Sequence, residues 1–197
     1  PPSQLGAFAK SHSNLKAPNL EWHVQPLSLE KFGSPLHTFN AITPSVCNLQ
    51  PTSRGSVKIT SSNAYDYPKI QLNYLSTPED ESIAVESLRF TRRIMKASAF
   101  DHFFPEELLP GKDIVSNEGL LNSARNIGTT IFHPVGTCKM GIDEFSVVNE
   151  KLRVHGVNKL RVVDASIMPK ITSGNTNAPT VMIAEKGAEM ILRENQL

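Results

Sequence analysis

The chain has 197 residues, 39% of them hydrophobic, which is enough for one large domain or two small ones with a buried core. Its formal net charge of +1 gives no basic field of the kind that nucleic-acid binding requires. The two cysteines, Cys47 and Cys138, are too few and too widely spaced for a disulfide framework or a zinc site. No run approaches the roughly 18 apolar residues of a membrane span, and no signal peptide is visible.

The first segment, residues 1–20, is polar and carries prolines, a glycine and scattered serines, so we expect a mobile entry. Short runs of β-type composition then alternate with turn residues, and they occupy residues 20–27, 38–49, 55–60 and 69–75. In the third run, Val57 and Ile59 alternate with polar residues. This alternation predicts an antiparallel sheet with one buried face and one wet face.

A helix is predicted next, from Pro78 to about residue 100, because its start carries several independent signals. Thr77 can cap it, Pro78 suits the first position, and three acidic residues follow where the helix dipole is positive. Its charged residues lie mostly off the apolar stripe and are expected to form a solvated face. A shorter helix is predicted near residues 118–125.

The last third of the chain is organised around two polar residues, His133 and Asn175. Residues 129–132 are predicted to form a strand that ends at His133, and residues 160–163 are predicted to form another. Asn175 lies in a loop before a helical segment, and Pro179 suits the start of that helix. Such a start leaves backbone N–H groups free, so its tip favours an anionic group.

Strands, a helix, a second set of strands and a terminal helix together predict an α+β fold. No Gly-x-Gly-x-x-Gly sequence follows a predicted strand, so the chain lacks a dinucleotide-binding fingerprint of its own. Because the sequence opens on Pro1-Pro2 rather than Met, we expect a piece excised from a longer protein.

Three motifs occur in a fixed order, namely HPVGT, LRVVDASIMP and SGNTNAPTVMIAEKGAEMI. Together with the upstream stretch SRGSVKITSSNAYDYPKIQLNYLSTPEDESIAVESLRFTRRI, they resemble the C-terminal part of the glucose-methanol-choline (GMC) flavoprotein oxidoreductases, and the choline dehydrogenase-like members above all. The resemblance implies that residues 21–128 form an antiparallel-sheet substrate-binding domain. Residues 129–197 would complete an FAD-binding domain whose N-terminal Rossmann half is absent. FAD would be bound mainly by that missing half, and the isolated fragment is expected to be inactive.

The resemblance gives His133 and Asn175 catalytic roles. His133 would accept the proton of an alcohol substrate, or stabilise its alkoxide, as hydride passes from the substrate carbon to flavin N5. Imidazole side chains suit this role because they titrate near operating pH. Asn175 would hydrogen-bond the substrate oxygen, since a carboxamide cannot act as a base. From the residues alone, His133 after an apolar run is more often structural, and Asn175 can serve as a turn residue.

The start of the last helix is implied to meet the flavin ring. Asn177 resembles a residue near the pyrimidine edge, and Pro179 with the N–H groups of Thr180 and Val181 would face the N1 and C2 carbonyl region. Reduction places negative charge there, so this contact would be electrostatic stabilisation.

Asp164 and Ala165 resemble the segment beside the ribityl and phosphate chain, where a backbone N–H or a ribityl hydroxyl contact is plausible. Asp164 as a simple loop cap is the alternative. Asn149 replaces an expected aspartate in a turn, which both residue types favour. Among the remaining histidines only His23 is a candidate for the substrate cavity, and none shows metal-ligand spacing, so no metal is expected.

The function implied is oxidation of a small primary alcohol by an FAD-dependent dehydrogenase or oxidase. Two alternatives remain open: a flavin-containing hydroxynitrile lyase-like relative, and a stand-alone binding module without catalysis. The expected partners are the alcohol and the N-terminal FAD-binding half of the same protein, with no nucleic acid and no membrane span. We expect a cytoplasmic protein, and membrane association of the full-length form stays open.

Overall fold

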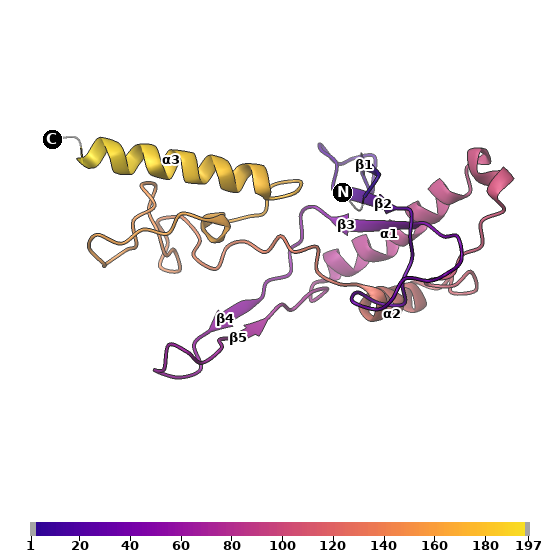
Figure 1. The fold of residues 1–197 in the computed structure, drawn as a ribbon, viewed down its shortest axis with the longest axis horizontal. Helices are drawn as coiled ribbons and strands as arrows, with labels where there is room; N and C mark the ends of the chain where they lie inside the picture. The colour runs from indigo at the N-terminus through magenta and orange to yellow at the C-terminus, as the bar shows by residue number, and fades with distance from the viewer. Residues whose placement is uncertain (1–2, 196–197) are drawn as a thin grey trace. The chain divides into compact units, whose positions relative to one another are not determined.

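The computed structural model describes residues 3–195, which form two compact units (Figure 1). Unit 1 comprises residues 3–55 and 72–131, and unit 2 comprises residues 56–71 and 132–195. None of the helices between residues 3 and 195 combines the length and the apolar composition that crossing a bilayer demands.

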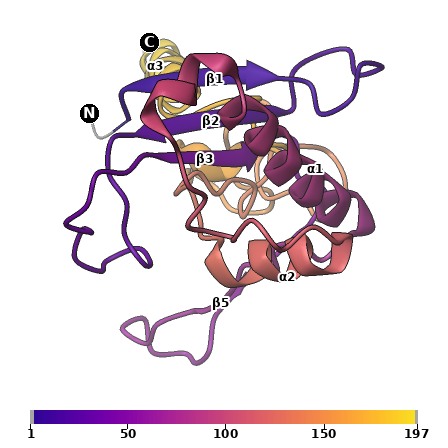
Figure 2. The ribbon, with the colours of Figure 1, turned by 90° about the vertical axis from the view of Figure 1, so that its right-hand side faces the viewer.

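Unit 1 is built on a three-stranded antiparallel sheet of order β1-β2-β3. Its strands are β1 (Leu5–Ala9), β2 (Leu20–Gln25) and β3 (Thr43–Asn48), which lie side by side in Figure 2. The second and third lie within two of the predicted runs. Strand β1 lies instead in the segment expected to be a mobile entry. It forms because its backbone pairs with β2, and the composition of the segment does not reveal that pairing.

Helix α1 (Pro78–Met95) begins as predicted. The Thr77 side chain accepts a hydrogen bond from the Asp80 amide, and Pro78 occupies the first turn. The helix ends five residues before the predicted end, and a short 3-10 helix, η1 (Ser98–Phe103), follows. Helix α2 (Asn117–Ile127) contains the second predicted helix and is capped by the Ser116 side chain.

The core of unit 1 lies between the sheet and α1, which crosses it in Figure 2. The Trp22 ring contacts Phe90 with 5.0 Å between ring centroids, and its Nε1 donates to Thr91 Oγ1 at 2.8 Å. Trp22 is only 2% exposed, while Leu20 and Leu120 are completely buried. A buried indole N–H group needs a hydrogen-bond acceptor, and Thr91 supplies it while Phe90 packs against the ring.

Asp80 fastens the loop after β3 to the start of α1. Its carboxylate accepts hydrogen bonds from the amides of Thr52 and Ser53 at 2.9 and 2.8 Å, and from Asn48 Nδ2 at 3.2 Å. Burial alone would raise the pKa of Asp80, but the hydrogen bonds from Ser53 and Thr52 outweigh it, so the pKa is lowered. The carboxylate is therefore a buried, charged link between two elements.

Unit 2 contains a separate two-stranded hairpin of β4 (Ser56–Lys58) and β5 (Lys69–Gln71). The prediction that one face of this run is buried is wrong for the described residues, because Val57 is 48% exposed and Ile59 is 89% exposed. The physical reason is that two strands alone cannot cover a sheet face.

The rest of unit 2 is mostly irregular backbone that packs beneath one long helix, α3 (Asn177–Asn195) (Figure 1). The strand predicted at residues 129–132 does not form, and Phe132 has a positive φ of 63°. At residues 160–163 the structure has only an isolated bridge between Arg153 and Arg161. A small apolar core holds this unit together, and its buried members are Val148, Leu152, Ile167, Met168 and Ile183.

Candidate active site

His133, Asn175 and Thr176 form a polar cluster within unit 2. Asn175 Nδ2 lies 2.9 Å from His133 Nε2, and Thr176 Oγ1 lies 2.8 Å from His133 Nδ1. Both ring nitrogens therefore have a partner from the loop before α3, 42 and 43 residues further along the chain. The structure thus brings together the two residues that the sequence singled out.

The segment after His133 is held by backbone bonds to a short 3-10 helix, η2 (Ala165–Ile167). The amide of Cys138 donates to the Ser166 carbonyl at 3.0 Å, and the amide of Met140 donates to the Ile167 carbonyl at 2.8 Å. Gly136, between them and His133, has a φ of 90°, which only glycine adopts readily. Phe132, immediately before His133, also has a positive φ, so His133 does not follow regular strand backbone.

Thr176 is a site residue that the sequence analysis missed. It is 6% exposed, and its carbonyl accepts the first hydrogen bond of α3, from the Thr180 amide at 3.0 Å. The same residue thus caps the helix and contacts the imidazole. The signal that would have found it is a threonine immediately before a helix that starts with an Asn-Ala-Pro sequence.

The two ring nitrogens of His133 have different partners. As the Asn175 amide is oriented, its side-chain nitrogen can only donate, so Nε2 accepts from it. Thr176 Oγ1 lies 2.8 Å from Nδ1, and the Thr176 amide donates to the same nitrogen at 3.4 Å. The lone pair of Nε2 consequently faces the exposed Asn175 side.

Helix α3 begins at Asn177, two residues before the predicted start at Pro179. The Thr180 amide is therefore internal to the helix, since it donates to the Thr176 carbonyl. By helix geometry the Val181 amide is internal as well, and the free N–H groups of the first turn are those of Asn177 and Ala178. Asn177 is exposed, whereas Pro179 and Thr180 are half-buried.

Asp164 caps η2, the alternative that the sequence analysis left open. Its Oδ1 accepts hydrogen bonds from the Ser166 amide at 2.7 Å and from the Ser166 hydroxyl at 2.5 Å. Ala165 packs against the apolar core of unit 2. Because the carboxylate is already engaged, any contact of this segment with a ligand falls more naturally to its backbone.

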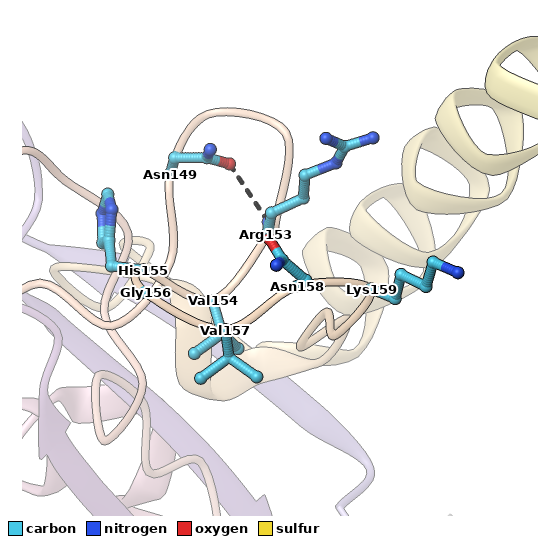
Figure 3. Close-up of a pocket in the computed structure, with 8 residues that line it drawn as sticks. All are labelled: Asn149, Arg153, Val154, His155, Gly156, Val157, Asn158 and Lys159. Carbon is cyan, nitrogen blue, oxygen red and sulfur yellow. Dashed lines mark hydrogen bonds between the residues drawn. The ribbon is translucent and has the colours of Figure 1, made fainter.

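A hollow of about 290 Å³ lies elsewhere in unit 2, at Asn149 and residues 153–159 (Figure 3). Asn149 Oδ1 accepts from the amides of Lys151 and Arg153 at 2.9 and 3.1 Å, the turn role expected of it. The dashed line in Figure 3 marks the second of these bonds. Neither His133 nor Asn175 lines this hollow, so it is separate from the polar cluster.

The chain belongs to the GMC oxidoreductase family, whose C-terminal family model matches residues 51–184. It is 42% identical over 192 residues to an alcohol dehydrogenase [acceptor] of Pseudomonas putida, covering 98% of this chain and 35% of that protein. It is 43% identical over 188 residues to an oxygen-dependent choline dehydrogenase of Proteus mirabilis, covering 95% and 34%. The chain thus spans about a third of the length of these relatives.

Solved structures share the fold. Pyridoxine 4-oxidase from Mesorbium loti matches with a TM-score of 0.85 and 32% identity, over 98% of this chain and 38% of that one. An FAD-dependent oxidoreductase from Chaetomium thermophilum matches with a TM-score of 0.77 and 28% identity, over 92% and 29%. The family resemblance is therefore confirmed, as is a fold that mixes helices with antiparallel sheet.

Proposed function

We propose that the chain is the C-terminal part of an FAD-dependent alcohol dehydrogenase or oxidase of the choline dehydrogenase type. One observation carries the proposal: the 2.9 Å contact between His133 Nε2 and Asn175 Nδ2. An imidazole and a carboxamide that converge can serve alcohol oxidation at the substrate oxygen. One removes the proton, and the other holds the oxygen in place.

In this mechanism the direct contact between Asn175 and His133 opens, and the hydroxyl of a primary alcohol takes its place between the two side chains. Asn175 Nδ2 donates to the substrate oxygen, and the substrate O–H donates to the lone pair of His133 Nε2. The proton moves to Nε2 as the hydride leaves the substrate carbon, which yields an aldehyde. Thr176 Oγ1, 2.8 Å from Nδ1, keeps the ring oriented before and after the transfer.

Bound FAD would supply the hydride acceptor, flavin N5. The first turn of α3 fits the electron-rich edge of such a ring, because its free amides carry partial positive charge. Asn177, Pro179 and Thr180 are the residues assigned to that edge, although the amides come from Asn177 and Ala178 rather than from Thr180. Asp164 and Ala165 are assigned to the ribityl side through their backbone.

The remaining part of the cofactor site would come from an N-terminal Rossmann half of the same protein. Its absence from these residues agrees with the length of the relatives, of which the chain covers 34–35%. The partners are then that half and a small alcohol, and we place the protein in the cytoplasm. The isolated chain should be inactive and should not purify with stoichiometric FAD.

The decisive experiment is anaerobic stopped-flow reduction of the flavin by alcohol in the full-length protein. His133→Ala should slow the reduction about 100-fold or more, the scale of a lost general base. Asn175→Ala should also slow it, with a rise in apparent substrate Kd. His155→Gln is the matched control, because His155 lies in the same unit and contacts the Gly141 carbonyl instead.

An unchanged reduction rate in His133→Ala would reject the role given to this residue. If alcohol failed to bleach the flavin of the unmodified protein, the lyase-like alternative would replace alcohol oxidation. If the full-length protein bound no FAD at all, the chain would belong to a binding module.

A further inference from the structure

The sheet of unit 1 carries a second cluster of chemically active side chains, on the face opposite α1. Side chains alternate along a strand, so Glu21 and His23 share one face of β2 while Trp22 between them contacts α1. Cys47 on β3 is the direct cross-strand partner of Glu21. A carboxylate, an imidazole and a thiol therefore meet on that face.

The polar atoms of the three side chains lie close to one another. His23 Nε2 is 3.3 Å from Glu21 Oε1, and Cys47 Sγ is 4.0 Å from Glu21 Oε2. All three potential ligand atoms lie within 4.8 Å of one another. Tetrahedral zinc, with ligand bonds of about 2.0–2.3 Å, holds its ligand atoms roughly 3.3–3.8 Å apart. Side-chain rotations that draw the three atoms closer together would be needed to enclose an ion.

His23 Nε2 is the feature that calls for a ligand. This atom is buried, and within the described residues it has no hydrogen-bond partner. Its approach to Glu21 Oε1 meets an ion-pair distance but lacks hydrogen-bonding alignment. Glu21 is itself only 5% exposed. Buried polar atoms without partners are costly, and a metal ion would satisfy this nitrogen. The carboxylate, whose Oε2 accepts a hydrogen bond from the Cys47 thiol, would exchange that bond for one to the metal.

We propose that Glu21, His23 and Cys47 bind a zinc ion. The donor set of one oxygen, one nitrogen and one sulfur matches the borderline-soft character of Zn²⁺ rather than Mg²⁺ or Ca²⁺. Three protein ligands leave a fourth position for water or for another small ligand. The spacing of the three residues in the sequence does not indicate a metal site. Glu21 and His23 lie two residues apart on β2, and the strand register brings Cys47 of β3 beside them.

Metal binding has to displace the thiol proton of Cys47. Burial, followed by the nearby Glu21 carboxylate, raises the pKa of Cys47 to about 11, so the metal-free thiol is protonated at neutral pH. Binding should therefore release a proton, as is usual for thiolate ligands.

The test is a titration of the full-length protein with Co²⁺, which substitutes for zinc and is visible spectroscopically. We expect one equivalent to produce visible bands of tetrahedral cobalt and a near-ultraviolet sulfur-to-cobalt charge-transfer band, both removed by added Zn²⁺. Cys47→Ser should abolish the charge-transfer band. Cys138→Ser, the matched control for the second cysteine, should retain it.

His23→Gln and Glu21→Gln should each weaken binding at least about 10- to 100-fold, since even residues that only support metal ligands contribute that much. Zn²⁺ should also raise the Tm of the unmodified protein and of Cys138→Ser, but not that of Cys47→Ser. The quantity compared is the change in Tm that Zn²⁺ causes in each protein, so a variant that is less stable without metal can still be tested.

Absence of the charge-transfer band from the unmodified protein would overturn the proposal. So would its persistence in Cys47→Ser, or cobalt binding that none of the three ligand substitutions weakens. Because none of these measurements uses alcohol oxidation or the flavin, they stand apart from the test of His133.

Discussion

The two units of the chain reach stability by different means. In unit 1, regular strands and helices enclose Leu20, Trp22 and Leu120, which are 0–2% exposed. In unit 2, irregular backbone lies beneath α3, and that helix keeps large apolar side chains such as Val181 and Met182 more than half exposed. Regular elements thus enclose the core of unit 1, whereas the smaller core of unit 2, around Val148 and Ile167, is formed mostly by irregular backbone and α3.

The comparison also teaches where reactive groups can be placed. The His133 cluster lies on irregular backbone, with positive φ angles at Phe132 and Gly136, and its partners Asn175 and Thr176 come from the loop before α3. The Glu21 cluster lies on a regular sheet, where the register alone determines which side chains meet. Substitutions should therefore act through packing in unit 1 and through local geometry in unit 2.

The largest effect is expected from removal of the central aromatic residue of unit 1. Trp22→Ala should lower the free energy of unfolding by about 3–5 kcal/mol, because it leaves a cavity against α1. Phe103→Ala is a control, since Phe103 is 69% exposed and its loss should cost much less. Urea unfolding followed by circular dichroism measures both. Equal losses from the two variants would contradict the view that unit 1 has a closed core.

Asp80→Ala should cost somewhat less, about 1–3 kcal/mol, because it removes the buried carboxylate that accepts hydrogen bonds from Thr52, Ser53 and Asn48. The lowered pKa of Asp80 adds a dependence on pH. Its stabilising contribution should be fully present above the pKa of the unfolded chain and should disappear as pH falls through the folded-state pKa.

The exposed Asp113 provides the control for this prediction. Asp113→Ala should leave the unfolding midpoint nearly unchanged in urea titrations at neutral pH. A stability difference between Asp80→Ala and the unmodified protein that stayed constant down to the lowest pH would show that the Asp80 charge is irrelevant.

A smaller effect is expected in unit 2, where Gly187 of α3 lies close to the side chains of Val163 and Leu152. A methyl group at this position would lie 2.6 Å from Val163 Cγ1, and valine is too stiff to move away cheaply. Gly187→Ala should therefore destabilise by about 1–2 kcal/mol, even though alanine favours helix.

Gly174→Ala is the matched control in the same unit, since a methyl group there meets nothing within 4 Å. Its Tm should stay close to that of the unmodified protein. If Gly187→Ala instead raised the Tm, helix propensity would outweigh the steric contact, and α3 would be less tightly packed than the structure indicates.

The smallest effect concerns one exposed turn of unit 2. A hydrogen bond from Lys139, followed by one from Ser146, lowers the pKa of Asp143 to about 2. Lys139→Met should move this pKa upward toward its ordinary value, with little change in stability because the pair is exposed. Carboxyl titration by NMR measures it. Lys186→Met, which removes a different pair, should leave Asp143 unaffected.

Local signals explain which elements could be predicted from sequence. Helix α1 was predictable because Thr77 and Pro78 specify its start without help from the rest of the chain. The run at residues 160–163 has the composition of a strand, yet only one residue there finds a bridge partner. Strand β1 was missed for the opposite reason, since its pairing with β2 prevails over a loop-like composition.

The same distinction applies to the sites. The family motifs indicated His133 and Asn175, and the structure brings their side chains together. Thr176 offered only a capping signal, a threonine just before a helix start, and its contact with the ring depends on where α3 begins. Glu21, His23 and Cys47 are meaningful only once the strand register is known, and a single sequence does not specify that register.

Thr176 has a consequence for dynamics, because one residue both caps the start of α3 and contacts the His133 imidazole. Fraying of the first turn of α3 would remove the Thr176 contact from the ring while the rest of the chain stays folded. Loss of reactivity on warming could then precede global melting, as a local event at the tip of one helix.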